Sequence, residues 1–337
     1  MADHLLAVRG LKTFFLTPKG EARAIDDVDL EIQSGETVGV VGESGCGKTM
    51  VALSILGLIP DPPGKIVAGE ILFKGRNLRE LDPEAMRAVR GNQISMIFQE
   101  PMTALNPVFT VGEQIAEVFR LHQINDSAQA MDKAADMLDV VGFPNPRQSL
   151  KSYPHELSGG MRQRVAIAIA LACSPDLLLA DEPTTALDVT IQAQILRLML
   201  ALQEKNGASI MLITHDLGIV AQTCRRVYVM YAGKIVEAAR VADIFHNPLH
   251  PYTQGLLASL PVWEKAIAHD ASRSGAKRSR LTPIAGTVPD LLAMPAGCAF
   301  HPRCPRAFAP CLERMPPLAQ PRTPTAGQGM VRCWLYE

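Results

Sequence analysis

The feature that most constrains this chain is the glycine-rich run Gly42–Thr49, which reads GESGCGKT and fits the pattern G-x-x-x-x-G-K-[ST]. The apolar residues Thr37–Val41 predict a strand directly before it, and Lys48–Leu58 has the pattern of a helix directly after it. Between a strand and a helix, such glycines let the backbone wrap around phosphate groups, which the helix N-terminus also attracts. The run therefore predicts a nucleotide-binding site in an α/β fold.

The residues of this phosphate loop have separate expected roles. Lys48 is expected to reach the β- and γ-phosphates of ATP, and the Thr49 hydroxyl is expected to coordinate Mg²⁺. Cys46 is interpreted as a small residue in a small slot; the alternative is a thiol whose pKa the helix N-terminus lowers. The candidate nucleotide-binding residues here are Gly42, Glu43, Ser44, Gly45, Cys46, Gly47, Lys48, Thr49 and Met50.

A second group of candidates follows the apolar run Leu177–Ala180. Asp181 would stand at the carboxyl end of a buried strand, which suits a second contact to Mg²⁺. Glu182 would face the γ-phosphate and could polarise the attacking water. The alternative is an ordinary surface turn after a core strand.

Charge and hydropathy exclude several classes of protein. The chain has 337 residues with 33 basic and 34 acidic side chains, so binding of nucleic acid through bulk charge is not expected. No apolar run approaches the ~18 residues that a membrane span needs. Residues Met1–Gly10 lack the pattern of a secretion signal. We therefore expect a soluble cytosolic protein, which could still sit against a membrane protein.

Strand-like and helix-like stretches alternate along residues 1–245, which predicts a parallel sheet in an α/β core. Residues 111–173 are helical in pattern without a convincing strand, so we interpret about 100–173 as a helical insert. Further strands are predicted at Gly69–Gly75, Ile94–Phe98, Leu177–Ala180, Ser209–Ile213, Val227–Tyr231 and Lys234–Glu237, and further helices at Ser158–Cys173 and Ile191–Leu202.

A third motif makes the pattern specific. Leu157–Gln163 reads LSGGMRQ, and it lies between the phosphate loop and the acidic strand. The chain resembles the nucleotide-binding subunits of ATP-binding-cassette (ABC) transporters, whose signature motif this segment matches. The resemblance covers roughly residues 5–245 and implies a P-loop NTPase cassette with an antiparallel β subdomain.

The resemblance implies that two cassettes pack head to tail and trap ATP between them. The phosphate loop of one then faces the signature of the other. Ser158 and Gly160, with Gly159 between them, would offer a hydroxyl and backbone N–H groups to the γ-phosphate at a second helix N-terminus. Hydrolysis would weaken the dimer, and this difference in affinity would drive the transport cycle.

The family pattern assigns further residues to the same site. Gln99, after the strand Ile94–Phe98, would contact Mg²⁺ or water. His215 would contact the γ-phosphate and hold Glu182 and the water in place, and Asp188 would reach across the dimer. Phe15 is the candidate for stacking on adenine, with Phe14 as its competitor; aromatic residues in such a strand are usually core.

Two segments narrow the resemblance to dipeptide and oligopeptide importers: Gln99–Pro107 and His246–Thr253. The resemblance implies an ATPase at the cytoplasmic face of the inner membrane. Its partners would be two transmembrane permease subunits, an extracytoplasmic peptide-binding protein and a second cassette, favoured to be a related but different chain. Residues Glu100–Phe119, with part of the insert, would form the cleft for a permease coupling helix.

Other functions stay open. The transported solute could instead be nickel, glutathione or another peptide-like solute. A non-transport cassette that acts on ribosomes or DNA is a further alternative, although this chain has one phosphate loop and no sustained heptads between that loop and the signature. The complete set of hydrolytic motifs argues against a redox enzyme.

Residues 246–337 are interpreted as a C-terminal extension, with a basic linker at 264–281. Its four cysteines at 298–333 suggest either a 4Fe–4S cluster, which the importer resemblance favours, or Zn²⁺; the alternative is four unrelated thiols. The segment is short and proline-rich, so we expect it to need a metal to fold. The proposed ligands are Cys298, Cys304, Cys311 and Cys333.

Overall fold

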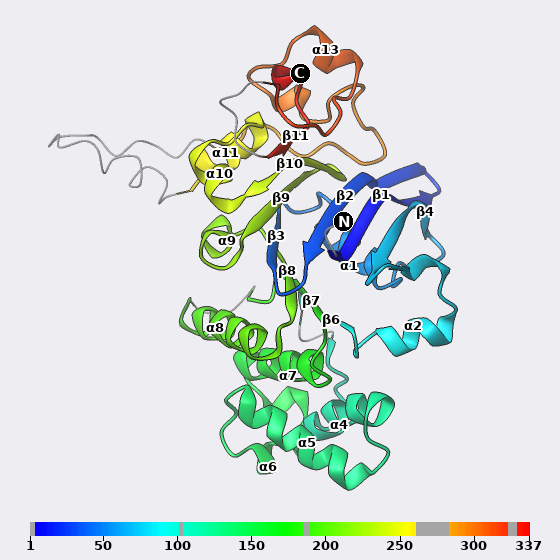
Figure 1. Ribbon diagram of the computed structural model, residues 1–337, viewed down its shortest axis with the longest axis vertical. Coiled ribbons are helices and arrows are strands. Elements are labelled where there is room, and N and C mark those ends of the chain that lie inside the picture. Colours follow the sequence, from blue (N-terminus) through cyan, green and yellow to red (C-terminus); the bar gives the residue numbers. More distant parts are fainter. Residues whose placement is uncertain (1–3, 101–103, 185–188, 261–282, 323–328) are drawn as a thin grey trace, which may run out of the picture.

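The computed structural model describes residues 4–100, 104–184, 189–260, 283–322 and 329–337 (Figure 1). Two sheets lie in the middle of the molecule. A group of helices occupies one end, and the C-terminal extension occupies the other. No helix among these residues is both long enough and apolar enough to cross a membrane.

The larger sheet holds the predicted parallel strands. Five neighbouring strands of this sheet are parallel to one another and almost completely buried, which explains why they read as continuous apolar runs. In spatial order the strands are β11 (Met330–Val331), β10 (Lys234–Arg240), β9 (Arg226–Tyr231), β3 (Thr37–Val41), β8 (Ser209–Thr214), β7 (Leu177–Asp181) and β6 (Ile94–Ile97).

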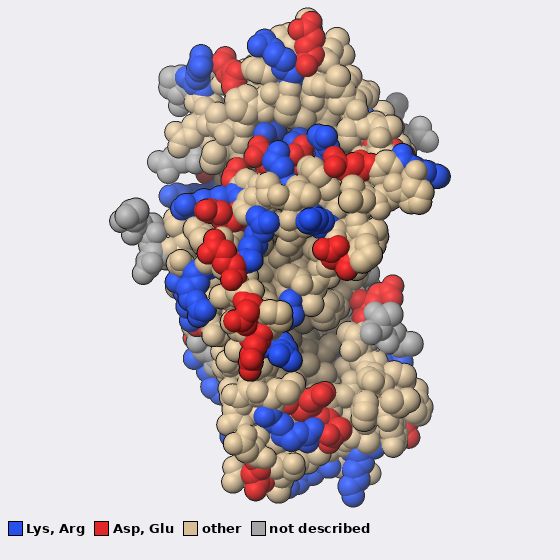
Figure 2. Space-filling model, turned by 90° about the vertical axis from the view of Figure 1, so that its right-hand side faces the viewer, with Lys and Arg blue, Asp and Glu red and all other residues tan. Residues whose placement is uncertain are grey.

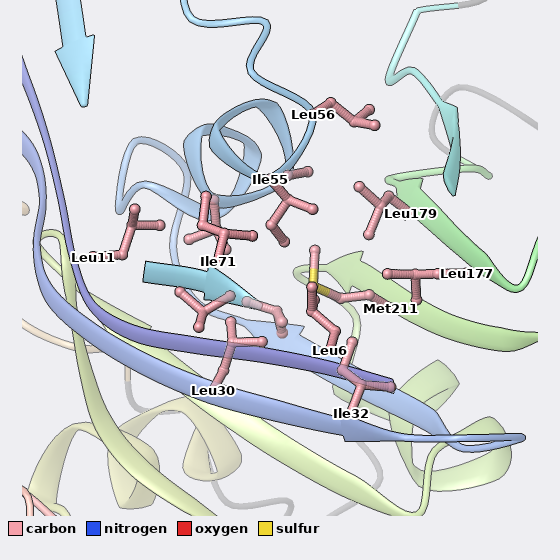
Figure 3. Close-up of a cluster of buried hydrophobic side chains, with 14 of the residues drawn as sticks. Leu6, Leu11, Leu30, Ile32, Ile55, Leu56, Ile71, Leu177, Leu179 and Met211 are labelled. Atoms are coloured by element: carbon pink, nitrogen blue, oxygen red, sulfur yellow. The ribbon is translucent and has the colours of Figure 1, made fainter. Parts of the chain in front are cut away.

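The smaller sheet is antiparallel, as the family resemblance implied. Its order is β2 (Gly20–Gln33), β1 (His4–Thr17), β4 (Gly64–Phe73) and β5 (Arg76–Asn77). The segment predicted as an edge strand, Gly69–Gly75, belongs mostly to β4, which pairs on both sides. Leucine and isoleucine side chains of this sheet pack on α1 (Lys48–Ile55) and on the larger sheet, and so join the two layers (Figure 3).

The predicted helical insert is present in the described residues. A second buried cluster joins its helices to β7 and β8. Helix α4 begins where Thr110 Oγ1 accepts a hydrogen bond from the N–H of Glu113. The helices of this region are α4 (Val111–His122), α5 (Ser127–Val140), α6 (Pro146–Ser149) and α7 (Gly159–Leu171).

The remaining helices surround the sheets. Helix α8 is longer at both ends than the predicted Ile191–Leu202. The remaining helices are α2 (Pro83–Val89), α8 (Val189–Asn206), α9 (Leu217–Thr223), α10 (Val241–His246), α11 (Pro251–Ala258) and α13 (Ala309–Glu313).

On the face in Figure 2, acidic and basic side chains are interspersed rather than separated by sign.

The described residues of the C-terminal extension share one buried cluster with the cassette. Phe300 lies against Tyr231 of β9 and Tyr252 of α11, with ring centroids 5.2 and 5.4 Å apart. Strand β11 pairs with β10 and so extends the larger sheet. The cassette supplies apolar surface to this segment, so packing against it is a source of stability besides the predicted metal. The linker predicted at 264–281 lies outside the described residues.

Candidate nucleotide site

The phosphate loop lies at the carboxyl end of β3, as predicted, and its backbone is tightly enclosed. Gly47, which precedes α1, has φ 104°, a conformation that favours glycine. A Cβ atom at this position would lie 2.5 Å from the carbonyl oxygen of Ala24. The loop therefore fits against β2 only because glycine stands there.

Lys48 lies along the inside of this loop. Its buried ammonium donates hydrogen bonds to the carbonyls of Gly42 and Glu43, at 2.9 and 3.0 Å. Cys46 is completely buried beside it, and burial raises the pKa of the thiol even though Lys48 lowers it. The alternative of a thiol with a lowered pKa is therefore wrong.

Asp181 is suited to hold a cation. Its carboxylate is buried at the end of β7, and neither oxygen has a hydrogen-bond partner in the described chain. Burial raises the pKa of Asp181 and the charge of Glu182 raises it further, whereas Thr49 and Lys48 lower it. A buried carboxylate beside a hydroxyl and an ammonium is costly unless a cation joins it. These oxygen donors fit Mg²⁺.

The three predicted hydrolytic residues come together at the same edge of the sheet. Gln99, Glu182 and His215 each lie within two residues of the carboxyl end of one of three neighbouring parallel strands. Gln99 Nε2 donates to one oxygen of Glu182 at 3.1 Å, and His215 Nδ1 lies 3.1 Å from the other. Both side chains thus orient one carboxylate, which is only 12% exposed.

The signature turn, Leu157–Gln163, begins helix α7. Ser158 caps this helix by accepting a hydrogen bond from the N–H of Met161 at 3.3 Å, and Ser158 and Gly159 are exposed. Further along, the buried Gln163 donates to the carbonyl of Pro183 beside the hydrolytic carboxylate. The turn is thus joined to the acidic strand and presents its first residues to solvent.

The other candidates are dispersed. Phe15 is half-buried in β1, with its ring beside Gly64 of β4. Ser44 and Gly45 are exposed at the tip of the phosphate loop. Met50 packs on the buried cluster that joins the two sheets. Asp188 lies outside the described residues.

The four C-terminal cysteines, Cys298, Cys304, Cys311 and Cys333, line one small cavity. Within the described residues, which include all four, no group of three or more His, Cys, Asp or Glu side chains is arranged to hold a metal ion. The structure therefore does not support the predicted 4Fe–4S cluster or Zn²⁺ site. The packing of Phe300 on the cassette gives this module another source of stability.

Two residues outside the predicted set also contact the phosphate loop. The hydroxyl of Tyr252 accepts a hydrogen bond from the N–H of Glu43 at 2.8 Å, and Arg303 forms an ion pair with the Glu43 carboxylate at 2.6 Å. Both come from beyond residue 246. Tyr252 lies within a segment that resembled peptide importers, but nothing in that pattern pointed to the loop.

The fold and this site define an ATP-binding cassette, and comparison with known proteins agrees. Residues 25–185 match the family model described as ABC transporter. The cassette MJ0796, in a dimeric post-hydrolysis state bound to ADP and Pi, superposes with a TM-score of 0.63 at 26% identity, over 70% of this chain and 98% of that one.

More specific matches cover nearly the whole chain. Residues 236–311 match the model of the oligopeptide/dipeptide transporter C-terminal region. The probable peptide ABC transporter ATP-binding protein y4tR of Sinorhizobium fredii is 54% identical over 95% of this chain and 92% of that protein. The oligopeptide transport ATP-binding protein AppD of Bacillus subtilis is 50% identical over 99% and 97%. The chain belongs to the family of peptide ABC transporter ATP-binding proteins.

Proposed function

We propose that this chain is the ATP-hydrolysing subunit of a peptide importer and that it works at the cytoplasmic face of the membrane. The observation that carries the hydrolytic part is the convergence of Gln99 and His215 on the two oxygens of Glu182. The peptide part is supported by the relatives, which are described as peptide, oligopeptide and dipeptide transport ATP-binding proteins.

The residues of the site divide the work of hydrolysis. Lys48 exchanges its contacts with the loop carbonyls for the β- and γ-phosphates of ATP. Thr49 and Asp181, with Gln99, would hold Mg²⁺, which when bound would neutralise charge that develops on the phosphates. Glu182 accepts a proton from the attacking water as general base. Gln99 and His215 keep that carboxylate in one orientation, so the water is aligned before the reaction.

A second cassette completes the site. The phosphate loop and the signature turn both expose residues to solvent: Ser44 and Gly45 in the first, Ser158 and Gly159 in the second. We propose that the signature turn of a partner cassette covers the γ-phosphate, with its helix N-terminus directed at the anion. Asp188 belongs to this proposed contact by its place in the family pattern. The partner is proposed to be a related but different chain.

The membrane partners are proposed to be two permease subunits, served by an extracytoplasmic peptide-binding protein. Val108 and Phe109 are 71% and 51% exposed, directly before helix α4. Apolar side chains exposed in this way suit a contact with another protein. They lie in the segment expected to receive the coupling helix of a permease subunit.

No metal in the cysteine module enters this proposal, since the described residues form no metal-holding group. The metal site predicted in the cysteine module can be tested separately. Iron and zinc analysis of the purified chain, with its visible absorption spectrum, would show a bound cluster or zinc ion if the prediction were right.

Uptake by the reconstituted complex tests the proposed function. The complex would be placed in vesicles with ATP inside and the binding protein outside, and labelled di- and oligopeptides, nickel and glutathione would be supplied in turn. We expect peptide uptake that requires ATP, and none with Glu182→Gln. Uptake of nickel or glutathione without any peptide uptake would contradict the peptide assignment. The matched control is Glu84→Gln, which changes an exposed glutamate of α2, outside the segment proposed to contact the permease.

A further inference from the structure

Two residues of the C-terminal extension, Arg303 and Tyr252 of helix α11, contact Glu43 of the phosphate loop from two sides. The two terminal nitrogens of Arg303 lie 2.6 and 3.0 Å from the two carboxylate oxygens of Glu43. The hydroxyl of Tyr252 accepts the backbone N–H of the same residue at 2.8 Å. Arg303 and Glu43 are 260 positions apart in the chain. The pair therefore joins the extension directly to the nucleotide loop.

Arg303 is fixed in place by other contacts. Its side chain is only 4% exposed, and its Nε donates to the carbonyl of Ala285 at 2.8 Å. The guanidinium lies 5.7 Å from the ring centroid of Tyr231 and 5.9 Å from that of Phe300. A bidentate arginine packed beside two rings has little freedom left to lose when it binds a carboxylate. It can therefore impose a position on Glu43.

The charge of Glu43 matters for the nucleotide. Its backbone carbonyl already contacts the Lys48 ammonium at 3.0 Å, so the residue belongs to the wall of the phosphate loop. A carboxylate here that lacked a cation would repel a bound triphosphate, and this side chain, 30% exposed, is screened less than a fully exposed one would be. Arg303 neutralises this carboxylate and holds it against the extension.

We propose that Arg303 is a positioning residue for ATP binding: it neutralises Glu43 and sets the conformation of the phosphate loop, so docking of the extension and affinity for ATP are coupled. This proposal rests on the proposed function. The coupling is reciprocal, so bound ATP stabilises the docked extension by the same free energy.

The test is a charge-rescue cycle on the full chain, with a fluorescent ATP analogue as ligand and thermal unfolding measured in parallel. Arg303→Met should weaken binding about tenfold, or about 1.4 kcal/mol, because the Glu43 carboxylate then stands alone. Glu43→Gln in that background should restore affinity to within about threefold of wild type, since the repelling charge is gone. A purely structural role of Arg303 would give no rescue.

Two further variants complete the experiment. Arg303→Lys keeps the charge but loses the paired geometry, and it should weaken binding about threefold; this variant decides the matter if Arg303→Met does not fold. Arg306→Met, at an exposed arginine of the same module, should leave affinity unchanged.

The outcomes separate the two proposals. A wild-type chain that does not bind the analogue would contradict the proposed function. A wild-type chain that binds, with Arg303→Met equally tight or with the double variant as weak as Arg303→Met, would overturn the role of Arg303 alone.

Discussion

The phosphate loop and the signature turn both place glycine-rich backbone at the start of a helix, but the chain surrounds them differently. The phosphate loop packs on β2, and Tyr252 and Arg303 bind its Glu43. The signature turn is anchored by the buried Leu157 and by the contact of Gln163 with Pro183, whereas Ser158 and Gly159 are exposed. One chain thus contains a phosphate loop that other parts of the chain hold in place and, separately, a helix N-terminus that is exposed to solvent. The difference supports the proposal that a single chain binds ATP, whereas hydrolysis needs the open turn of a partner.

The strongest way to break this comparison is the substitution Gly159→Glu. A Cβ atom at Gly159 would have no heavy atom within 4 Å, so the side chain fits in one chain without strain. An acidic residue in the first turn of α7 also suits the helix dipole. In a closed pair, however, the carboxylate would oppose the γ-phosphate of the partner's ATP.

We expect Gly159→Glu to bind ATP like wild type and to lose hydrolysis by at least about 100-fold, the size of effect seen when a transition-state contact is lost. Binding and turnover would be measured in the same preparation. Gly159→Gln is the control for size without charge. Wild-type turnover by Gly159→Glu would mean that this turn does not face a nucleotide.

A smaller effect tests the contacts that hold the phosphate loop in place. Tyr252→Phe keeps the buried ring but removes the acceptor for the N–H of Glu43. We expect ATP affinity to fall about fivefold, or about 1 kcal/mol, the usual worth of one hydrogen bond. Titration with a fluorescent ATP analogue would measure it.

The matched control for this prediction is Tyr336→Phe. The Tyr336 hydroxyl donates to the carbonyl of Leu249 at 2.9 Å, so that hydrogen bond also lies in the C-terminal part of the chain but does not reach the loop. We expect its ATP affinity to equal that of wild type. Equal losses in both variants would mean that the effect reports general loosening rather than a brace on the loop.

How much of the fold and of the site could be predicted from the sequence depended on whether each feature leaves a pattern in neighbouring residues. Strand β3 was found at the residues predicted, because a buried parallel strand reads as an unbroken apolar run. The long strands β1 and β2 were expected only through the family resemblance. Their pairing contains several register shifts, which break the alternation that would reveal a half-buried strand.

The residues of the site also differ in whether a local sequence pattern predicts them. Gln99, Glu182 and His215 each follow a predicted strand, so parallel topology alone brings them to one edge of the sheet. The contact of Arg303 with Glu43 joins residues 260 positions apart and has no local pattern. The described residues do not support the expected metal site, and the apolar surface that the cassette offers to Phe300 has no local pattern in the sequence either.

The central claim is that Glu182, oriented by Gln99 and His215, is the base for ATP hydrolysis between two cassettes. Glu182→Gln tests it most directly, by ATP binding, phosphate release and cassette association measured on the assembled complex. We predict bound ATP, hydrolysis slower by at least about 100-fold, and cassettes that stay associated when ATP is present. Phosphate release at the wild-type rate would contradict the claim.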